Sequence, residues 1–405
     1  MADVIVIGGG AAGMAAAIAA ASCGDHVIVL ERMDRVGKKI LATGNGRCNL
    51  MNMGARRYPG GTALANRVLD LCGAGEQTRF WHYLGLRMRQ EDGGRVYPIS
   101  GMASTVLDCL RLTMDALQVE TITGVHVDGL HPSKRGWTVM SGEQKWRAAR
   151  VIVAGGGCAQ PKLGSDGSTW SLLTPLGHTL VKPAPALTQI ITDTAPIRGL
   201  SGIRARCEVR ITRGMQEKYR EAGELLFADY GVTGVCVMQC ARYAAPGDTL
   251  HMDLTRAMGF NGKEDFLREL QRRRKVWAVR PQSELLTGLC VPKLAQALCQ
   301  AAGLNGMQRA VCANLTGTQL ERLAAMAADF QLMVKGVKGF DNAQVTAGGI
   351  ASHEFDPVTL RSTMAEGVHA AGEVIDVDGD CGGFNLMFAF GSGILAGLDG
   401  RQAPW

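Results

Sequence analysis

Long hydrophobic runs are missing from this sequence of 405 residues, and no apolar stretch is long enough to cross a bilayer. The first residues form an apolar segment and lack the basic start and small-residue cleavage site of a signal peptide. No C-x-x-C pair occurs among the twelve scattered cysteines, so neither a zinc site nor a disulfide framework is expected. Together these absences predict a cytoplasmic protein with reduced thiols, no bound metal and no membrane partner.

An excess of charge of one sign is also missing, because 43 basic residues face 37 acidic ones and the net charge is only +6. One basic cluster, residues 268–275, departs from this balance. It is interpreted either as a nucleic-acid-binding patch or as the solvated face of an amphipathic helix. The small net charge favours the helix face. We therefore expect a small-molecule substrate and no nucleic-acid partner.

Glycine is abundant, with 53 residues, and its first cluster is the most informative. An apolar segment, residues 3–7, meets the spacing G-x-G-x-x-G at Gly8, Gly10 and Gly13. An alanine-rich segment, residues 11–22, then leads to a second apolar segment that ends in Glu31. This order predicts the strand–helix–strand unit that binds dinucleotides.

Each part of this fingerprint has a physical role. Gly8 allows the tight turn, Gly10 lets the backbone approach a pyrophosphate, and Gly13 lets helix and strand pack closely. The helix start at Ala11 offers N–H groups to the phosphates. Glu31 accepts hydrogen bonds from ribose hydroxyls and disfavours a 2′-phosphate. The fingerprint alone leaves NAD and FAD equally open.

Two further segments carry polar side chains beside glycines. Residues 43–49 read Thr-Gly-Asn-Gly-Arg-Cys-Asn, and these side chains, with Lys38, are suited to a phosphate or a ring edge. A plain surface loop is the alternative interpretation. Near the C-terminus, Glu373 and Asp376 follow a predicted strand, and a helix is expected over 386–398, with Gly383-Phe-Asn at its opening. Carboxylates suit polyol hydroxyls and a helix start suits a ring carbonyl, although a purely structural unit is possible.

A second glycine cluster follows the buried segment that ends at Ala154 and Gly155. It lacks the third glycine, and Pro161 interrupts the helix that a fingerprint requires. The sequence therefore predicts one dinucleotide domain, split between the chain ends, which suits a bulky cofactor such as FAD. The expected fold is α/β and Rossmann-like, with the domain formed by residues 1–185 and 346–405. The insertion, 186–345, is expected to be β-rich over about 186–255 and 330–345 and helical over about 256–330.

The chain resembles the HI0933-like flavoprotein family, which includes BaiN-type bile-acid reductases and proteins named aminoacetone oxidases. The resemblance covers almost the whole chain and rests on these motifs: Gly37-Lys-Lys with residues 43–49, Gly94–Pro98, Gly223–Phe227 with Tyr230–Gly234, Val345–Ile350, and Ala371–Asp376 with Gly382–Asn385. It implies a two-dinucleotide-binding-domain-like fold with non-covalent FAD. Residues 164–170 read Gly-Ser-Asp-Gly-Ser-Thr-Trp where the family tends to Gly-Ser-Thr-Gly-Asp-Gly-Tyr, and Cys381 replaces a threonine. Substrate preference is therefore not carried over.

The fingerprint and the resemblance together predict a set of cofactor contacts, with residues 43–49 and 382–385 expected beside the isoalloxazine ring. The set comprises Gly8, Gly10, Ala11, Ala12, Gly13, Glu31, Arg32, Lys38, Thr43, Gly44, Asn45, Arg47, Cys48, Asn49, Ala154, Gly155, Gly372, Glu373, Asp376, Gly383, Phe384 and Asn385.

The expected function is an FAD-dependent oxidoreductase that uses NAD(P)H to reduce an activated C=C bond in a small or steroid-like molecule. An amine oxidase that uses oxygen is the alternative within the same class. A flavin-bearing protein that binds nucleic acid or a partner through residues 268–275 is the alternative of another class. Candidate catalytic residues are Arg47, Tyr230 and Cys381. His353 is more simply a surface residue, and Cys48 with Cys381 more simply two buried thiols than a redox pair.

Overall fold

The computed structural model describes residues 1–304 and 310–405, and these form two compact units. The first unit contains Met1–Pro185 and Phe340–Trp405, and the second contains Ala186–Gly339. Residues 305–309, which fall in the segment expected to be helical, lie outside the described residues. Within the described residues, no helix combines the length and the apolar character needed to cross a membrane.

The first unit is built on a seven-stranded sheet with the order β6-β2-β1-β9-β8-β7, in which β18 also pairs with β9. Its strands β1, β2, β6, β9 and β18 are parallel, whereas β7 and β8 form an antiparallel edge. The parallel strands at the centre are buried, which explains their almost continuous apolar sequence. The bounds are β1 Ala2–Ile7, β2 Val27–Glu31, β6 Glu120–Thr123, β7 Gly129–Ser133, β8 Gly136–Ser141, β9 Gln144–Val153 and β18 Val368–Ala370.

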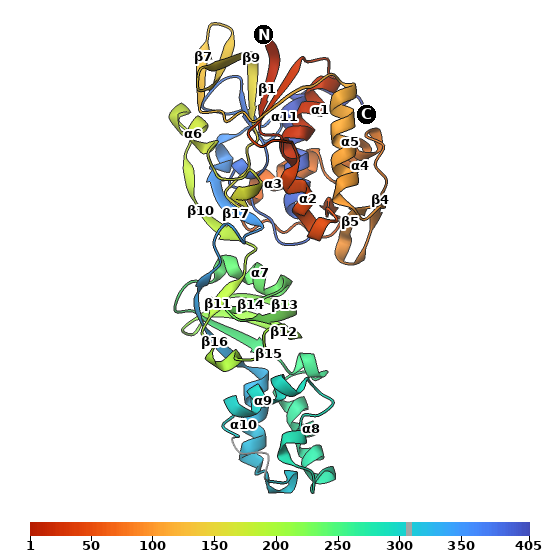
Figure 1. Ribbon diagram of the computed structural model, residues 1–405, viewed down its shortest axis with the longest axis vertical. Coiled ribbons are helices and arrows are strands. Elements are labelled where there is room, and N and C mark those ends of the chain that lie inside the picture. The colour runs from red at the N-terminus through yellow and green to blue at the C-terminus, as the bar shows by residue number, and fades with distance from the viewer. Residues whose placement is uncertain (305–309) are drawn as a thin grey trace. The chain divides into compact units, whose positions relative to one another are not determined.

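Two helices from opposite ends of the chain, α1 (Ala11–Ser22) and α11 (Phe384–Leu398), lie side by side in this unit (Figure 1). Their backbones approach closely because small residues line the contact. A Cβ atom added at Gly393 would lie 2.2 Å from the carbonyl oxygen of Ala12. The C-terminal segment therefore completes the domain that the N-terminal segment begins.

Shorter elements surround this core. Strands β4 and β5 pair antiparallel as a hairpin, and β3 pairs with β5 on its other side. A separate two-stranded sheet joins β10 and β17. The bounds are α2 Lys38–Ala42, α3 Thr62–Leu71, α4 Ala74–Tyr83, α5 Ala103–Ala116, α6 Trp170–Leu173, β3 Met51–Asn52, β4 Met88–Gln90, β5 Arg95–Pro98, β10 Leu180–Ala186 and β17 Val345–Ile350.

The second unit contains a closed barrel with the strand order β11-β14-β13-β12-β15-β16. Alternate residues of β12 are buried and exposed, which is the pattern of a strand with one face toward a core. The helices α8, α9 and α10 lie together beyond the barrel (Figure 1). The bounds are β11 Ile190–Thr192, β12 Arg204–Arg213, β13 Gln216–Ala228, β14 Gly231–Thr233, β15 Thr249–Asp253, β16 Phe330–Val337, α7 Val235–Cys240, α8 Lys263–Val276, α9 Pro292–Ala301 and α10 Gly317–Ala328.

Candidate cofactor site

The first glycine cluster has the geometry that its spacing predicts. A Cβ atom at Gly8 (φ +102°) would lie 2.6 Å from the carbonyl oxygen of Ala154, and one at Gly13 would lie 1.8 Å from that of Gly8. Gly10 differs, because a Cβ atom there would meet nothing within 4 Å. Gly8 and Gly13 are thus required by the fold, whereas the open side of Gly10 leaves room for a ligand.

The start of α1 is suited to an anion. Its N-cap residue, Gly10, makes no side-chain capping hydrogen bond, and the first turn contains no acidic residue. The first N–H groups of a helix have no partner inside the helix, and the helix dipole favours negative charge there. A phosphate group therefore fits this end of α1.

Glu31 is the last residue of β2, and Arg32 follows it at the same edge of the sheet. The carboxylate of Glu31 accepts N–H hydrogen bonds from Gly9 (2.6 Å) and from Met33 (2.8 Å), so it is fixed beside the glycine loop. Arg32 pairs with Asp166. The Nε atom of Arg32 is buried without a hydrogen-bond partner among the described residues, so it is a donor that a cofactor can satisfy.

The second glycine cluster contributes close backbone packing. Only a short 3₁₀ turn, Pro161–Leu163, follows it, and no α-helix starts there. A Cβ atom at Gly157 would lie 2.5 Å from Oγ1 of Thr346. That hydroxyl accepts the N–H groups of Cys158 (2.8 Å) and Ala159 (3.0 Å). The cluster therefore joins β17 to the sheet edge and is not a second dinucleotide fingerprint.

The C-terminal carboxylates are held at this edge as well. Glu373 accepts the N–H of Thr346 at 2.7 Å through Oε1, and its Oε2 lies 2.7 Å from Nζ of Lys39. Asp376 accepts the N–H of Gly348 at 3.1 Å. A Cβ atom at Gly372 would lie 2.8 Å from the Cβ of Ala12, so this turn packs against the first turn of α1.

The polar loop of residues 43–49 folds over Tyr97. Gly44 (φ +56°) and Asn45 (φ +55°) both adopt left-handed backbone conformations, which the Gly-Asn sequence permits. The guanidinium of Arg47 stacks 4.1 Å from the ring centre of Tyr97 and lies 2.6 Å from Oε1 of Glu91. Lys38 is directed to a different partner, Asp34, at 2.5 Å.

Asn49 and Gly383 bring this loop to the start of α11. A Cβ atom at Gly383 (φ +103°) would lie 2.8 Å from Oδ1 of Asn49. This oxygen is buried and has no hydrogen-bond partner among the described residues. Asn385, by contrast, exchanges two 2.8 Å hydrogen bonds with the backbone of Gly379, and the hydroxyl of Tyr58 donates to the carbonyl of Phe384. The unsatisfied acceptor on Asn49 fits a polar cofactor.

The three candidate catalytic residues belong to different units. Arg47 and Cys381 are in the first unit, whereas Tyr230 is in the second, where Nζ of Lys338 lies 4.4 Å from its ring centre. Burial raises the pKa of Tyr230 and the pKa of Cys381. His353 is exposed, which agrees with its interpretation as a surface residue.

The two thiols considered as a redox pair are poor thiolates. Burial raises the pKa of Cys48 to about 12, and it also raises the pKa of Cys381. A thiol must lose its proton to act as a nucleophile or a redox partner. Both groups are therefore protonated at neutral pH, which argues against a redox pair, although only Cys48 is buried and Cys381 is half-buried.

Sequence analysis missed a polar cluster around His178. Its Nδ1 lies 2.8 Å from Oε2 of Glu354, and its Nε2 lies 2.7 Å from Oγ of Ser362. That hydroxyl oxygen also accepts the N–H groups of Met364 (3.0 Å) and Ala365 (2.9 Å). Because both lone pairs of Oγ are used, Ser362 donates its proton to the imidazole and is not a free nucleophile. The cluster fixes two loops to each other.

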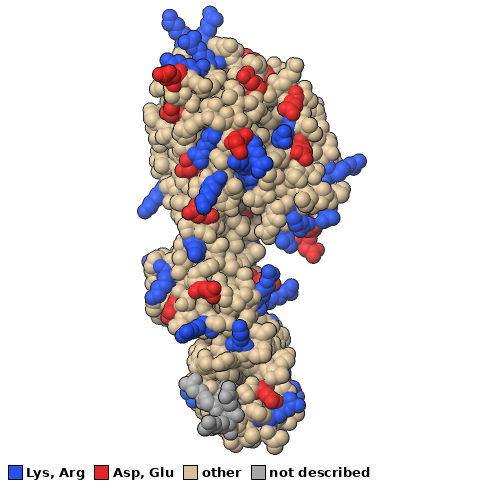
Figure 2. Space-filling model, in the orientation of Figure 1, with Lys and Arg blue, Asp and Glu red and all other residues tan. Residues whose placement is uncertain are grey.

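The basic cluster at residues 268–275 is only partly a solvated face. Arg272 pairs with Glu269 at 2.7 Å on the helix surface. Arg273 is buried instead, and it donates to the carbonyl groups of Leu285 (3.0 Å) and Thr287 (2.7 Å). The expectation of a solvated face is therefore wrong for Arg273, which caps carbonyls that would otherwise be unsatisfied. Basic and acidic side chains are interspersed on the visible surface (Figure 2).

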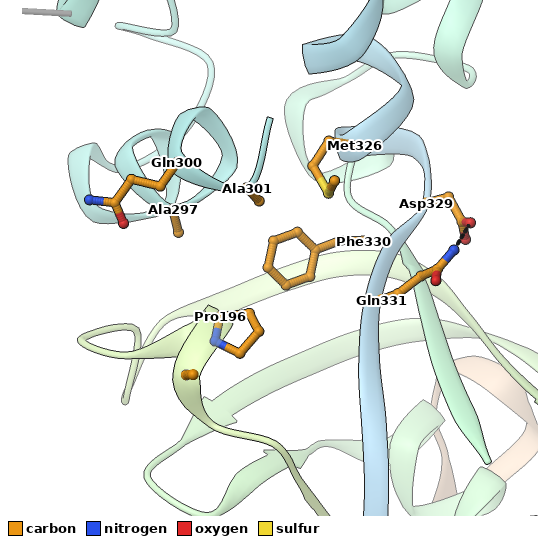
Figure 3. Close-up of a pocket in the computed structure, with 9 residues that line it drawn as sticks. Pro196, Ala297, Gln300, Ala301, Met326, Asp329, Phe330 and Gln331 are labelled. Carbon is orange, nitrogen blue, oxygen red and sulfur yellow. Dashed lines mark hydrogen bonds between the residues drawn. The ribbon is translucent and has the colours of Figure 1, made fainter. Parts of the chain in front are cut away.

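A hollow of about 530 Å³ opens in the second unit, between the helices and the barrel (Figure 3). Its lining includes Pro196, Ala297, Met326, Asp329 and Phe330. The predicted cofactor residues all belong to the first unit, so this hollow is a separate feature. Within the described residues, no group of three or more His, Cys, Asp and Glu side chains is arranged to hold a metal ion.

Several known proteins are similar to this chain in sequence or in fold. A family model described as the HI0933-like protein Rossmann domain matches residues 2–399. A 3-dehydro-bile acid delta(4,6)-reductase from Clostridium scindens is 38% identical, over 98% of this chain and 99% of its own. A ribosomal RNA dihydrouridine synthase from Haemophilus influenzae is 25% identical, over 97% of each chain. The solved 3-ketosteroid-delta4-(5alpha)-dehydrogenase from Rhodococcus jostii RHA1 is similar in fold, with a TM-score of 0.50, 18% identity and coverage of 99% and 97%.

Proposed function

The chain belongs to the HI0933-like protein Rossmann domain family and is an FAD-dependent oxidoreductase, and we propose that it uses NAD(P)H to reduce an activated C=C bond in a steroid-like molecule. The observation that carries this proposal is the 38% identity to a bile acid delta(4,6)-reductase over nearly the full length of both chains. The name of that relative describes reduction of double bonds beside an oxidised ring position. The match extends over both units of the chain.

The residues of the first unit support a cofactor role in this reaction. FAD, when bound, would supply hydride transfer between the nicotinamide and the substrate. The start of α1 would hold its phosphates, and Glu31 and Glu373 would accept hydrogen bonds from its hydroxyl groups. The start of α11 at Gly383 would present N–H groups to ring atoms that become negative on reduction. Asn49 would offer its unsatisfied oxygen to an N–H group.

A second candidate substrate is a uridine base in RNA, because a relative named as a ribosomal RNA dihydrouridine synthase matches 97% of the chain at 25% identity. The uracil double bond is conjugated to a carbonyl group, so the two candidate substrates share one kind of reaction. They differ in size and charge. Binding of RNA depends strongly on salt, whereas binding of a steroid does not.

The proposal is tested by turnover without oxygen. The yellow protein is mixed with NADH or NADPH and then with a 3-oxo steroid that has a conjugated double bond, the matching saturated 3-oxo steroid or an RNA fragment. A primary amine is added to a separate sample without a nicotinamide. We expect oxidation of the nicotinamide beyond one equivalent per flavin, and a product with two more hydrogen atoms, only with the unsaturated steroid. Reduction of uridine would favour the second candidate. Reduction of the flavin by the amine, reversed by air, would identify an oxidase and contradict both.

A further inference from the structure

We propose that Lys39 is the cation that makes the carboxylate of Glu373 compatible with a bound diphosphate, and that it anchors FAD electrostatically. The inference rests on the proposed position of FAD at the edge formed by α1 and the turn after β18. Lys39 follows Lys38 in the Gly-Lys-Lys motif, and sequence reasoning selected only the first lysine. The structure assigns the two lysines to different partners.

The carboxylate of Glu373 is fixed through both oxygens. Its Oε2 lies 2.7 Å from Nζ of Lys39, and its Oε1 accepts the N–H of Thr346 at 2.7 Å. Thr346 is fully buried and is tied to the second glycine cluster through Cys158. Glu373 therefore joins α2, β17 and the glycine cluster at one point, and it cannot turn away from a ligand without breaking these contacts.

The position of this carboxylate creates an electrostatic problem for the ligand. Gly372, the preceding residue, packs against Ala12 in the first turn of α1, where the helix start suits a phosphate. A carboxylate near a diphosphate repels it, and the repulsion is larger at a partly buried site than in water. The side chains of Lys39 and Glu373 are only 24% and 20% exposed. The ammonium of Lys39 offsets this repulsion while the hydrogen-bonding capacity of the carboxylate remains.

Lys38 does not have this geometry. Its ammonium lies 2.5 Å from Oδ1 of Asp34, and the side chain of Lys38 is 20% exposed whereas that of Asp34 is 75% exposed. Because the Asp34 carboxylate is exposed, water and salt screen this pair more than they screen the pair of Lys39 and Glu373. Successive residues of a helix point about 100° apart, which explains how adjacent lysines reach different partners. Lys38→Met is thus a comparison that changes the same charge one position away.

The test measures FAD affinity of the apoprotein by quenching of flavin fluorescence, with the Tm of each apoprotein measured alongside. We expect Lys39→Met to weaken FAD binding about tenfold or more, and Lys39→Arg to stay within about threefold of the parent. Lys38→Met should weaken binding less than Lys39→Met. Lys145→Met, on an exposed hairpin position, is the control for loss of one positive charge.

A double variant separates an electrostatic anchor from a purely structural ion pair. If Lys39 acts by offsetting Glu373, Lys39→Met with Glu373→Gln binds FAD more tightly than Lys39→Met alone, and added salt narrows the gap between Lys39→Met and the parent. Equal affinities of the parent and Lys39→Met would overturn the inference and leave the proposed function intact. A parent protein that binds no FAD would instead overturn the cofactor assignment itself.

Discussion

A Cβ atom placed on Gly13 would lie 1.8 Å from the carbonyl oxygen of Gly8, so the first helix and the first loop leave no space for a side chain at this point. Gly10 lies between Gly8 and Gly13 in the sequence, and a Cβ atom placed on it would meet no atom within 4 Å. The three glycines of the fingerprint therefore divide into two that the fold requires and one whose open side leaves room for a ligand.

This difference predicts separable effects of two similar substitutions. Gly13→Ala should lower the free energy of unfolding by about 3 kcal/mol, because the overpacked helix must move away from the loop. Gly10→Ala should change that free energy of the apoprotein by less than about 1 kcal/mol and yet abolish flavin binding. Urea unfolding and the flavin content of the purified protein measure the two effects. A Gly10→Ala protein with full flavin content would contradict this account.

The buried imidazole of His369 predicts a pH dependence of stability. Burial lowers its pKa, although Asp399 accepts a hydrogen bond from Nε2 at 2.9 Å and opposes this effect, and Nδ1 has no partner among the described residues. The unfolded imidazole binds a proton near pH 6.5, whereas the folded one does so only at lower pH. The unfolded state thus holds more protons below about pH 6.5, and stability falls as the pH decreases toward 5.

Urea unfolding of the parent and of His369→Gln at pH 7, 6 and 5 checks this prediction. In the parent, the free energy of unfolding should fall with decreasing pH more steeply than in the variant. The difference in slope should be at most about 1.4 kcal/mol per pH unit, which corresponds to one proton. The guanidinium groups of Arg150 and Arg361 are near and remain charged throughout this range. Asp399 does not contribute to the slope, because its pKa is held well below its usual value and its effect is confined to more acidic solutions. Equal slopes for both proteins would contradict the assignment.

The basic cluster of α8 predicts two outcomes for neighbouring arginines. Arg273→Met should lower the free energy of unfolding by about 3 kcal/mol, because the carbonyl groups of Leu285 and Thr287 lose their donor and Glu269 loses one partner. Arg268→Gln should change it by less than about 0.5 kcal/mol, because that side chain is exposed and makes an exposed ion pair with Asp265. Chemical denaturation of both variants measures the two free energies of unfolding. Equally small losses in both variants would show that Arg273, like Arg268, belongs to a solvated surface.

Thiol accessibility provides a further prediction. Burial raises the pKa of Cys48 to about 12, so this thiol should resist iodoacetamide at pH 8 in the folded protein. Cys23 is half-buried at the end of α1 and should be modified under the same conditions. Peptide mapping by mass spectrometry distinguishes the two sites, and unfolding in urea should make Cys48 react. Labelling of Cys48 before unfolding would show that the loop at 43–49 opens in solution.

The Rossmann-like fold and the first glycine loop were predictable because local spacing determines them. Within six residues of chain, the spacing specifies a turn at Gly8, an open side at Gly10 and a close contact at Gly13. The acidic residue at the end of the next strand, Glu31, was equally visible, and its hydrogen bond to Gly9 follows from parallel pairing of β1 and β2.

Other features depend on long-range contacts that no local pattern shows. Closure of the barrel requires β11 to pair with β16, although more than a hundred residues separate these strands in sequence. The choice of Lys39 over Lys38 depends on where Glu373 returns after the insertion. Burial of Arg273 depends on the carbonyl groups of the following loop. Predicting these three features would require information on which residues distant in sequence are in contact.

The most direct test of the account is a single-turnover experiment on the purified protein without oxygen. The visible absorbance of the flavin is followed while NADH or NADPH is added, and then while an unsaturated 3-oxo steroid is added to the reduced protein. The account predicts bleaching in the first step and return of the colour in the second, with one molecule of saturated product for each flavin. A yellow protein that neither nicotinamide bleaches, or a reduced protein that the steroid does not reoxidise, would contradict the proposed function.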